Sequence, residues 1–233
     1  MAARQVALDT ETTGLFAKSG DRVIEIGCVE ILNRRITERN FQRFVNPEHE
    51  IEEGAAKVHG LTQEFLADKP RFAEVAAEFL DYVRGAELVI HNAEFDVEFL
   101  DRELELAGLG TLSEHAGGIV DTLAIARELH PGKKNSLDAL CERYAVDNSH
   151  RTLHGALLDA RLLAEVYLAM TRGQESLAMD LEEAPTAATV AAARIDASKL
   201  VVVRASPEEV GAHEKYLDTL DKEVEGGSVW RKL

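Results

Sequence analysis

The chain is poor in cysteine and in positive charge. Its 233 residues include two cysteines, Cys28 and Cys141, and both lie in apolar segments. We expect them to be reduced core residues, which excludes a disulfide framework. Lysine and arginine number 26 against 42 acidic residues, giving a net charge of −16. This balance argues against a protein that binds nucleic acid through a broad basic surface.

Long apolar runs are also missing. No run approaches the about 20 apolar residues that span a bilayer. Residues 1–5 lead into a strand-like segment without the apolar stretch of a signal peptide. The sequence therefore predicts a cytoplasmic protein. Hydrophobic residues make up 45% of the chain, which is enough for one sizeable core.

Strand-like and helix-like segments follow each other along the first 170 residues. Strands are expected at 5–9, 22–32, 37–45, 87–91 and 119–121. Helices are expected within 52–66 as two short turns, and over 72–83, 92–108, 122–130, 136–144 and 153–170. The first three strands favour an antiparallel meander, and the last two, which alternate with helices, favour parallel pairing. The prediction is an α/β fold with a mixed five-stranded sheet flanked by helices.

The composition changes beyond the expected folded domain at residues 1–175. Residues 176–198 contain few large apolar groups and indicate a flexible linker. Residues 199–233 hold a strand-like run at 200–203, an expected helix at 207–223 and the only tryptophan, Trp230. Fewer than about 40 residues do not easily build a core. We expect a docking segment here, and the alternative is a tail that packs back onto the domain.

Four acids occupy positions where buried apolar side chains would be expected: Asp9, Glu11, Asp96 and Asp159. Asp9 and Glu11 share one face of a strand, and Asp159 lies within the apolar stripe of its helix. Taken singly, each has an ordinary explanation: an exposed strand end for Asp9 and Glu11, the helix dipole for Asp96, and a structural hydrogen bond for Asp159. Together, buried carboxylates require neutralisation, and all-oxygen ligands favour Mg²⁺ or Mn²⁺ over Zn²⁺.

His154 precedes Asp159 by five residues, a spacing that puts the two on different faces of a continuous helix. We expect His154 at the frayed start of that helix, beside Gly155. A histidine there can act as general base on a metal-bound water. Two metals suit in-line phosphoryl displacement by an activated water, so the five residues together predict a two-metal site for that chemistry.

Three motifs resemble those of the DEDDh 3′–5′ exonuclease family: the run from Asp9 to Gly14, the run from His91 to Asp96, and the His154–Asp159 pair. The resemblance implies a ribonuclease H-like fold with two Mg²⁺ or Mn²⁺ ions. Asp9, Glu11, Asp96 and Asp159 would hold the metals, and His154 would be the general base. It further implies contacts with the 3′-terminal nucleotides from Thr12, Leu15, His59, Asn92 and Phe95. Leu15 and Phe95 could stack on bases, and core packing is the alternative for Phe95.

Segments 86–92, 132–141 and 151–160 are similar to the proofreading branch of this family, whose members serve the bacterial DNA polymerase III. The similarity implies a 3′–5′ exodeoxyribonuclease that removes mispaired nucleotides from the DNA 3′ end. It also implies that the C-terminal segment docks on the polymerase alpha catalytic subunit, with a small accessory subunit as a further partner. Gln174, Leu177 and Met179 are placed like a sliding-clamp-binding segment, although Met179 stands where an aromatic residue is often favoured.

Two other functions fit parts of the sequence. A free-standing DEDDh exonuclease that trims DNA or RNA would need its own basic groove or dimer surface, and the acidic charge and the docking tail count against it. A non-catalytic scaffold would be favoured by the loss of a catalytic acid, and all five expected catalytic residues are present.

Overall fold

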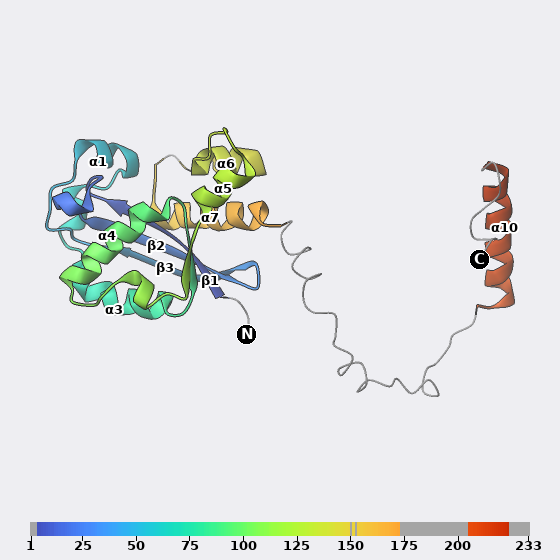
Figure 1. Cartoon of the computed structure of the whole chain (residues 1–233), viewed down its shortest axis with the longest axis horizontal. Helices are drawn as coiled ribbons and strands as arrows, with labels where there is room; N and C mark the ends of the chain where they lie inside the picture. The colour runs from blue at the N-terminus through green and yellow to red at the C-terminus, as the bar shows by residue number, and fades with distance from the viewer. Residues whose placement is uncertain (1–3, 150, 152, 173–204, 224–233) are drawn as a thin grey trace, which may run out of the picture. The chain divides into compact units, whose positions relative to one another are not determined.

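The computed structural model describes residues 4–149, 151, 153–172 and 205–223 (Figure 1). The chain divides into two compact units, Met1–Asp180 and Leu181–Leu233. The described part of the second unit contains helix α10 (Pro207–Glu223), where the sequence predicts a helix. The expected linker, the run at 200–203, the clamp-binding residues Gln174, Leu177 and Met179, and Trp230 lie outside the described residues. No helix in the described ranges is both long and apolar enough to cross a membrane.

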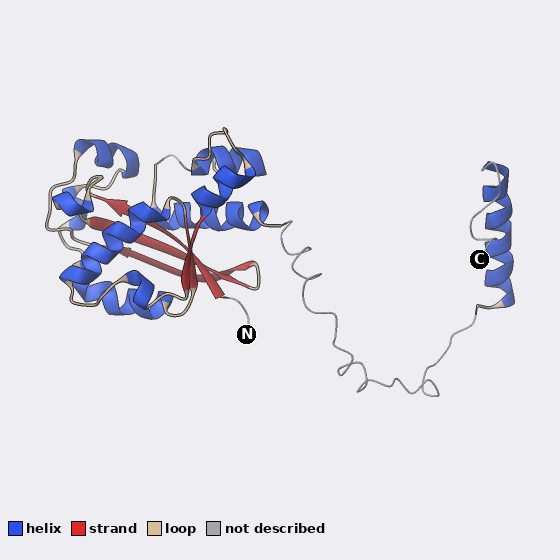
Figure 2. Ribbon diagram, in the orientation of Figure 1, coloured by secondary structure: helices blue, strands red, loops and turns tan. Residues whose placement is uncertain are grey.

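One mixed sheet organises the first unit, with strand order β3-β2-β1-β4-β5 (Figure 2). Strands β1 (Arg4–Thr12), β2 (Val23–Leu32) and β3 (Arg35–Phe44) pair antiparallel. Strands β4 (Glu87–Ile90) and β5 (Gly118–Asp121) add parallel to β1. This topology confirms the mixed five-stranded sheet expected from the sequence.

Helices cover both faces of the sheet (Figure 1). One core forms between the sheet and helices α3 (Phe72–Val83) and α4 (Ala93–Leu106). The other forms between the sheet and helices α5 (Thr122–Leu129), α6 (Leu137–Tyr144) and α7 (Ala156–Met170). Val6 and Leu8 of β1 enter the first core and Ala7 enters the second, as the two-residue period of a strand requires.

Short helices fill the connections. Helices α1 (Glu53–His59) and α2 (Gln63–Leu66) link β3 to α3, and they are the two turns expected within 52–66. Single 3-10 turns, η1 (Ala17–Ser19) and η2 (Leu112–Glu114), follow β1 and α4. The chain reverses after α1 at Gly60, whose φ of 72° favours glycine.

Two element boundaries near the motifs differ from the prediction. β1 continues past Asp9 to Thr12, because residues 10–12 keep pairing with β2. Helix α7 begins at Ala156 and not at residue 153, because the backbone of Gly155 is extended and His154 N donates to Val58 O at 3.0 Å. His154 therefore lies in the loop before the helix.

Asn92 stands at the start of α4, where the sequence predicts the helix over 92–108 to begin. It occupies the N-cap position with a left-handed backbone, φ 67°, and its side chain makes no cap hydrogen bond. Its backbone N–H instead donates to Asp121 Oδ1 at 3.1 Å, which ties the start of α4 to the end of β5.

Gly27 of β2 lets the first turn of α7 rest on the sheet. It pairs with Asp9, and a Cβ atom there would lie 2.1 Å from the Ala156 carbonyl carbon and 2.2 Å from Leu157 N.

We predict that Gly27→Ala lowers the free energy of unfolding by about 3 kcal/mol, because backbone atoms must move to admit the methyl group. Urea unfolding measures this. Gly54→Ala is the matched control, because nothing lies within 4 Å of a Cβ there. Equal stability of the two variants would contradict the close approach.

Candidate active site

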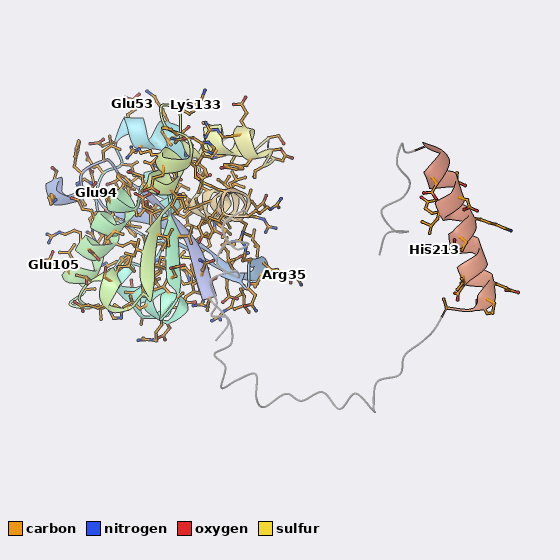
Figure 3. All side chains as sticks on the ribbon, turned by 45° about the vertical axis from the view of Figure 1, so that its right-hand side comes forward. Arg35, Glu53, Glu94, Glu105, Lys133 and His213 are labelled. Atoms are coloured by element: carbon orange, nitrogen blue, oxygen red, sulfur yellow. The ribbon has the colours of Figure 1, made fainter. Side chains whose placement is uncertain are left out.

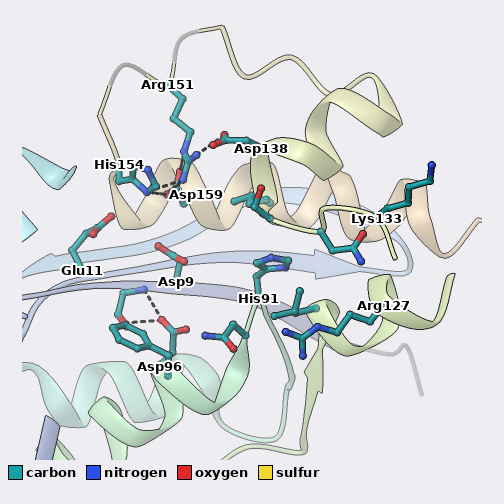
Figure 4. Close-up of a pocket in the computed structure, with 17 residues that line it drawn as sticks. Asp9, Glu11, His91, Asp96, Arg127, Lys133, Asp138, Arg151, His154 and Asp159 are labelled. Carbon is teal, nitrogen blue, oxygen red and sulfur yellow. Dashed lines mark hydrogen bonds and ion pairs between the residues drawn. The ribbon is translucent and has the colours of Figure 1, made fainter. Parts of the chain in front are cut away.

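The five predicted catalytic residues line one cleft of about 720 Å³ (Figure 4). Asp9 and Glu11 come from β1, Asp96 from α4, Asp159 from α7 and His154 from the loop before α7. Elements far apart in sequence meet here because β1 is the central strand and both helix layers reach its C-terminal end. Glu11, Asp96 and Asp159 are buried, and Asp9 is half-buried.

Asp96 is tied directly to β1. Its Oδ1 accepts hydrogen bonds from Thr10 N at 3.0 Å and from Thr10 Oγ1 at 2.7 Å. Thr10 stands between the two acids of the strand, and its side chain points to the opposite face. The threonine thus fixes α4 relative to Asp9 and Glu11, a role that the sequence analysis did not assign.

Arg151 is a residue of the cleft that the sequence analysis missed. Its Nε and Nη2 donate to the two oxygens of Asp159, both at 2.6 Å, and Nη1 donates to Asp138 Oδ1 at 2.6 Å (Figure 4). The arginine side chain is 7% exposed. This bidentate contact neutralises Asp159 from a loop whose path no local sequence pattern reveals.

His154 lies beside Asp159 and before the first residue of α7, at the helix start where the sequence places it. Its Nδ1 is 3.2 Å from Asp159 Oδ2 and accepts a hydrogen bond from Arg151 Nη2 at 2.8 Å. Because His154 precedes the first helical residue, its loop can fold back over the first turn of α7. Its side chain remains 43% exposed, which leaves it accessible to substrate and water.

Burial raises the pKa of Asp9, Glu11 and Asp96, and neighbouring carboxylates raise it further for Asp9 and Glu11. Burial, followed by the charges of Asp96, Asp159 and Glu11, raises the pKa of Asp9 well above its usual range. Burial, followed by Asp159 and Glu25, raises the pKa of Glu11 to about 8. Burial also raises the pKa of Asp96. Ionising all of these groups therefore needs more positive charge than Arg151 supplies.

The donor set fits divalent metals. Ligand atoms of Glu11, His154 and Asp159 lie within 4.8 Å of one another. Asp9 and Asp96 add carboxylate oxygens to the same cleft. Oxygen donors of this kind suit hard cations, and a bound cation would favour the ionised form of each acid.

The free energy of unfolding of the metal-free protein should fall as pH rises from about 4.5 to about 8. The pKa of Glu11 rises from 4.5 to about 8 on folding, so the folded chain holds this proton more tightly than the unfolded chain. Its stabilisation is present below the lower value and is lost through the upper one. Glu11→Gln should flatten the profile in thermal unfolding with EDTA. Stability that rises across this window in the unsubstituted protein and falls in Glu11→Gln would contradict the assignment.

Arg151→Gln should lower the metal-free free energy of unfolding by about 3 kcal/mol, because it leaves Asp159 buried without its partner. Stabilisation by Mn²⁺ should be larger in the variant than in the unsubstituted protein, because no guanidinium then competes for Asp159. Urea unfolding with EDTA and with Mn²⁺ measures both effects. Arg161→Gln is the control, since that arginine makes an exposed pair with Glu165 on the same helix. Unchanged metal-free stability in Arg151→Gln would contradict this role.

The structure divides the predicted substrate contacts into two groups. Asn92 and Phe95 line the cleft, and Phe95 is also half-buried against Phe99, with ring centroids 4.9 Å apart. Thr12, Leu15 and His59 are not among the residues that line it.

Each residue of the second group has a distinct setting. Thr12 is buried and its hydroxyl donates to Gly14 O at 2.6 Å, whereas Leu15 is 65% exposed. His59 is buried near the Thr12 carbonyl and His154, and burial lowers its pKa. It therefore lies near the loop that carries His154 and does not line the cleft.

Comparison with known proteins places the chain in a family. Residues 6–167 match the family model described as exonuclease. The chain is 52% identical to DNA polymerase III subunit epsilon of Escherichia coli K12, over 98% of this chain and 97% of that protein. It is 45% identical to the subunit of the same name in Haemophilus influenzae, over 98% and 95% of the two chains.

Solved exonuclease structures share the fold. Exonuclease X in complex with 5′ overhanging duplex DNA is 26% identical, with a TM-score of 0.56 over 74% of this chain and 93% of that one. The nuclease domain of 3′hExo, a DEDDh family member bound to rAMP, is 19% identical, with a TM-score of 0.64 over 73% and 92%. The chain belongs to the exonuclease family and, within it, to the epsilon subunits of DNA polymerase III, proofreading 3′–5′ exonucleases with a ribonuclease H-like fold.

Proposed function

We propose that this chain proofreads DNA by hydrolysing the 3′-terminal phosphodiester with two divalent metal ions, Mg²⁺ or Mn²⁺. The proposal rests on one observation: four acids from β1, α4 and α7 line the same cleft. The pKa values of three of them, Asp9, Glu11 and Asp96, are raised. Asp9, Glu11, Asp96 and Asp159 hold the metals. When bound, the metals stabilise the charge on the attacking and leaving oxygens.

His154 is the general base in this proposal. In the metal-free cleft Nδ1 accepts a hydrogen bond from Arg151, so the base must form once Arg151 has left Asp159. Nδ1 then carries the hydrogen and donates it to Asp159 Oδ2, 3.2 Å away, and the lone pair of Nε2 takes the proton of the attacking water. The water oxygen bonds to phosphorus, and the bond from phosphorus to the 3′ oxygen of the preceding nucleotide breaks. The products are a deoxynucleoside 5′-monophosphate and a strand shortened by one nucleotide, whose 3′ oxygen acquires a proton.

Mispaired ends are preferred because they fray. A mispaired terminus yields single strand at lower cost than a paired one, and Asn92 and Phe95 line the cleft that receives it. We propose that Thr12, Leu15 and His59, which do not line the cleft, also contact the 3′-terminal nucleotides. The experiment follows a 5′-labelled primer on a template, paired or mispaired at its 3′ end. We expect faster shortening of the mispaired primer and none in EDTA. Equal rates on both primers and on RNA would favour a free-standing trimming exonuclease.

The tail directs this activity to the polymerase. We propose an exonuclease domain at residues 1–175, a linker at 176–198 and a docking segment at 199–233 that binds the alpha catalytic subunit. Similarity to the polymerase III epsilon subunits over 98% of the chain supports this division. So do the exposed Val210 and Tyr216 side chains of α10. The clamp-binding role of Gln174, Leu177 and Met179 and the accessory-subunit contact belong to the same proposal.

Co-purification tests the docking segment. The full chain and a version ending at Asp180 are recovered from native lysate and their partners are identified. We expect the polymerase catalytic subunit with the full chain alone. Recovery of the polymerase with the version ending at Asp180 would refute the tail assignment.

A further inference from the structure

Two unpaired cations line the active-site cleft away from its acids. Arg127 lies near the end of α5, and Lys133 lies in the loop between α5 and α6. In Figure 4 both lie on the far side of His91 from Asp9 and Asp159. Both side chains are exposed, and neither makes an ion pair or side-chain hydrogen bond with the described residues. Arginines elsewhere in this acidic protein commonly pair with acids, so free cations in the cleft are unusual.

The loop that carries Lys133 is held in place by hydrogen bonds. Arg143 Nη1 donates to the buried Asn135 Oδ1 at 3.0 Å, and Arg143 Nη2 donates to Lys134 O at 2.8 Å. Asn135 Nδ2 and Lys133 N both donate to His130 O, at 3.3 and 3.2 Å. Lys133 is therefore presented from a fixed backbone at the surface of the first unit (Figure 3).

Among the described residues that line the cleft, His91 lies between the acids and the two cations. His91 Nδ1 is 2.9 Å from Thr122 Oγ1, and burial lowers the pKa of its ring. This ring, whose ionised form is disfavoured by burial, separates the two ends of the cleft. A phosphate at the acidic end needs metals to neutralise the carboxylates, whereas a phosphate at the other end meets Arg127 and Lys133 directly.

The polarity of the substrate determines which phosphates reach the cations. A strand hydrolysed at its 3′-terminal phosphodiester continues only on the 5′ side of that bond. We propose that Arg127 and Lys133 form a subsite for phosphates of the substrate strand on the 5′ side of the scissile bond. This inference rests on the proposed function of the cleft and extends it to the substrate's length.

The test compares two substrates in the full-length chain with Mn²⁺. One is a 5′-labelled 12-nucleotide single strand, and the other is the p-nitrophenyl ester of thymidine 5′-monophosphate, which carries a single phosphodiester. The double variant Arg127→Ala/Lys133→Ala should raise KM for the oligonucleotide about tenfold. It should also make the dependence of log KM on log salt shallower by about 1.4, the value for two phosphate contacts on a single strand. The ester's kinetics should stay within twofold, because the ester has no upstream phosphate.

Lys134→Ala is the matched control. Lys134 is an exposed lysine of the same loop, and it does not line the cleft. It should leave KM for both substrates unchanged, which shows that the loss of a lysine charge beside the cleft does not by itself raise KM.

Three results would overturn the inference. An unchanged oligonucleotide KM in the double variant refutes the subsite. A KM that rises only on primer–template duplex assigns the cations to the template strand. If KM for the oligonucleotide rises by the same factor in Lys134→Ala as in the double variant, a general loss of positive charge explains the effect and the subsite is refuted. Failure of the unsubstituted chain to hydrolyse the ester would instead count against the proposed function, so the two failures are distinguishable.

Discussion

Asp9→Asn should lower turnover on a mispaired primer by about 10³-fold or more and weaken Mn²⁺ binding. The asparagine keeps the shape of the side chain but removes a charge from the metal site. The free energy of unfolding of the metal-free protein should rise at pH 8. Burial and the charges of Asp96, Asp159 and Glu11 disfavour the ionised Asp9 carboxylate in the folded chain, and the asparagine removes this cost. Docking of the C-terminal segment should be unaffected. Steady-state hydrolysis, calorimetric titration with Mn²⁺ and urea unfolding measure the first three effects, and co-purification with the polymerase measures the last.

Asp81→Asn is the control for that substitution, because Asp81 makes an exposed pair with Arg84 on the surface. It should change neither turnover nor Mn²⁺ affinity. An Asp9→Asn variant with near-full activity would refute the metal assignment. Lost activity with unchanged Mn²⁺ affinity would show that Asp9 acts in some other way.

His154→Gln should lower turnover by about 10² to 10⁴-fold, the usual contribution of a general base, and leave Mn²⁺ affinity within severalfold. The two substitutions thus separate metal binding from proton transfer. Single-turnover hydrolysis and Mn²⁺ titration on the same preparation measure both quantities. His213→Gln, at an exposed position of α10, is the control (Figure 3).

A loss of Mn²⁺ affinity in His154→Gln would indicate that the histidine binds the metal directly. Its ring nitrogen lies close enough to Glu11 and Asp159 to share a metal with them. If His154→Gln loses Mn²⁺ affinity as completely as Asp9→Asn does, the histidine is a ligand and the general-base assignment is wrong.

The sheet and most helices could be predicted from the sequence because their signals are local. Alternating apolar residues mark β2, and helical spacing marks α3 and α6. The acids could be found because each interrupts such a pattern. Asp159 was expected within the apolar stripe of its helix, and it lies there with 2% of its surface exposed.

The contacts that the sequence did not predict depend on how distant segments fold together. Arg151 reaches Asp159 from the loop before α7, and that loop also bonds to Val58 of α1 through His154 N. His154 itself lies before the start of α7 and beside Asp159. The pairing of Thr10 with Asp96 depends on the packing of α4 against β1. No periodic pattern within a single segment predicts these contacts between segments.

The central claim is that the carboxylates of this cleft hold divalent metals and that Arg151 occupies Asp159 only in their absence. Anomalous diffraction from crystals grown with Mn²⁺ tests it most directly. We predict two manganese peaks among Asp9, Glu11, Asp96 and Asp159, with the guanidinium of Arg151 no longer bidentate on Asp159. Crystals at saturating Mn²⁺ that show no peak in the cleft, with Arg151 still bound to both oxygens of Asp159, would contradict the claim.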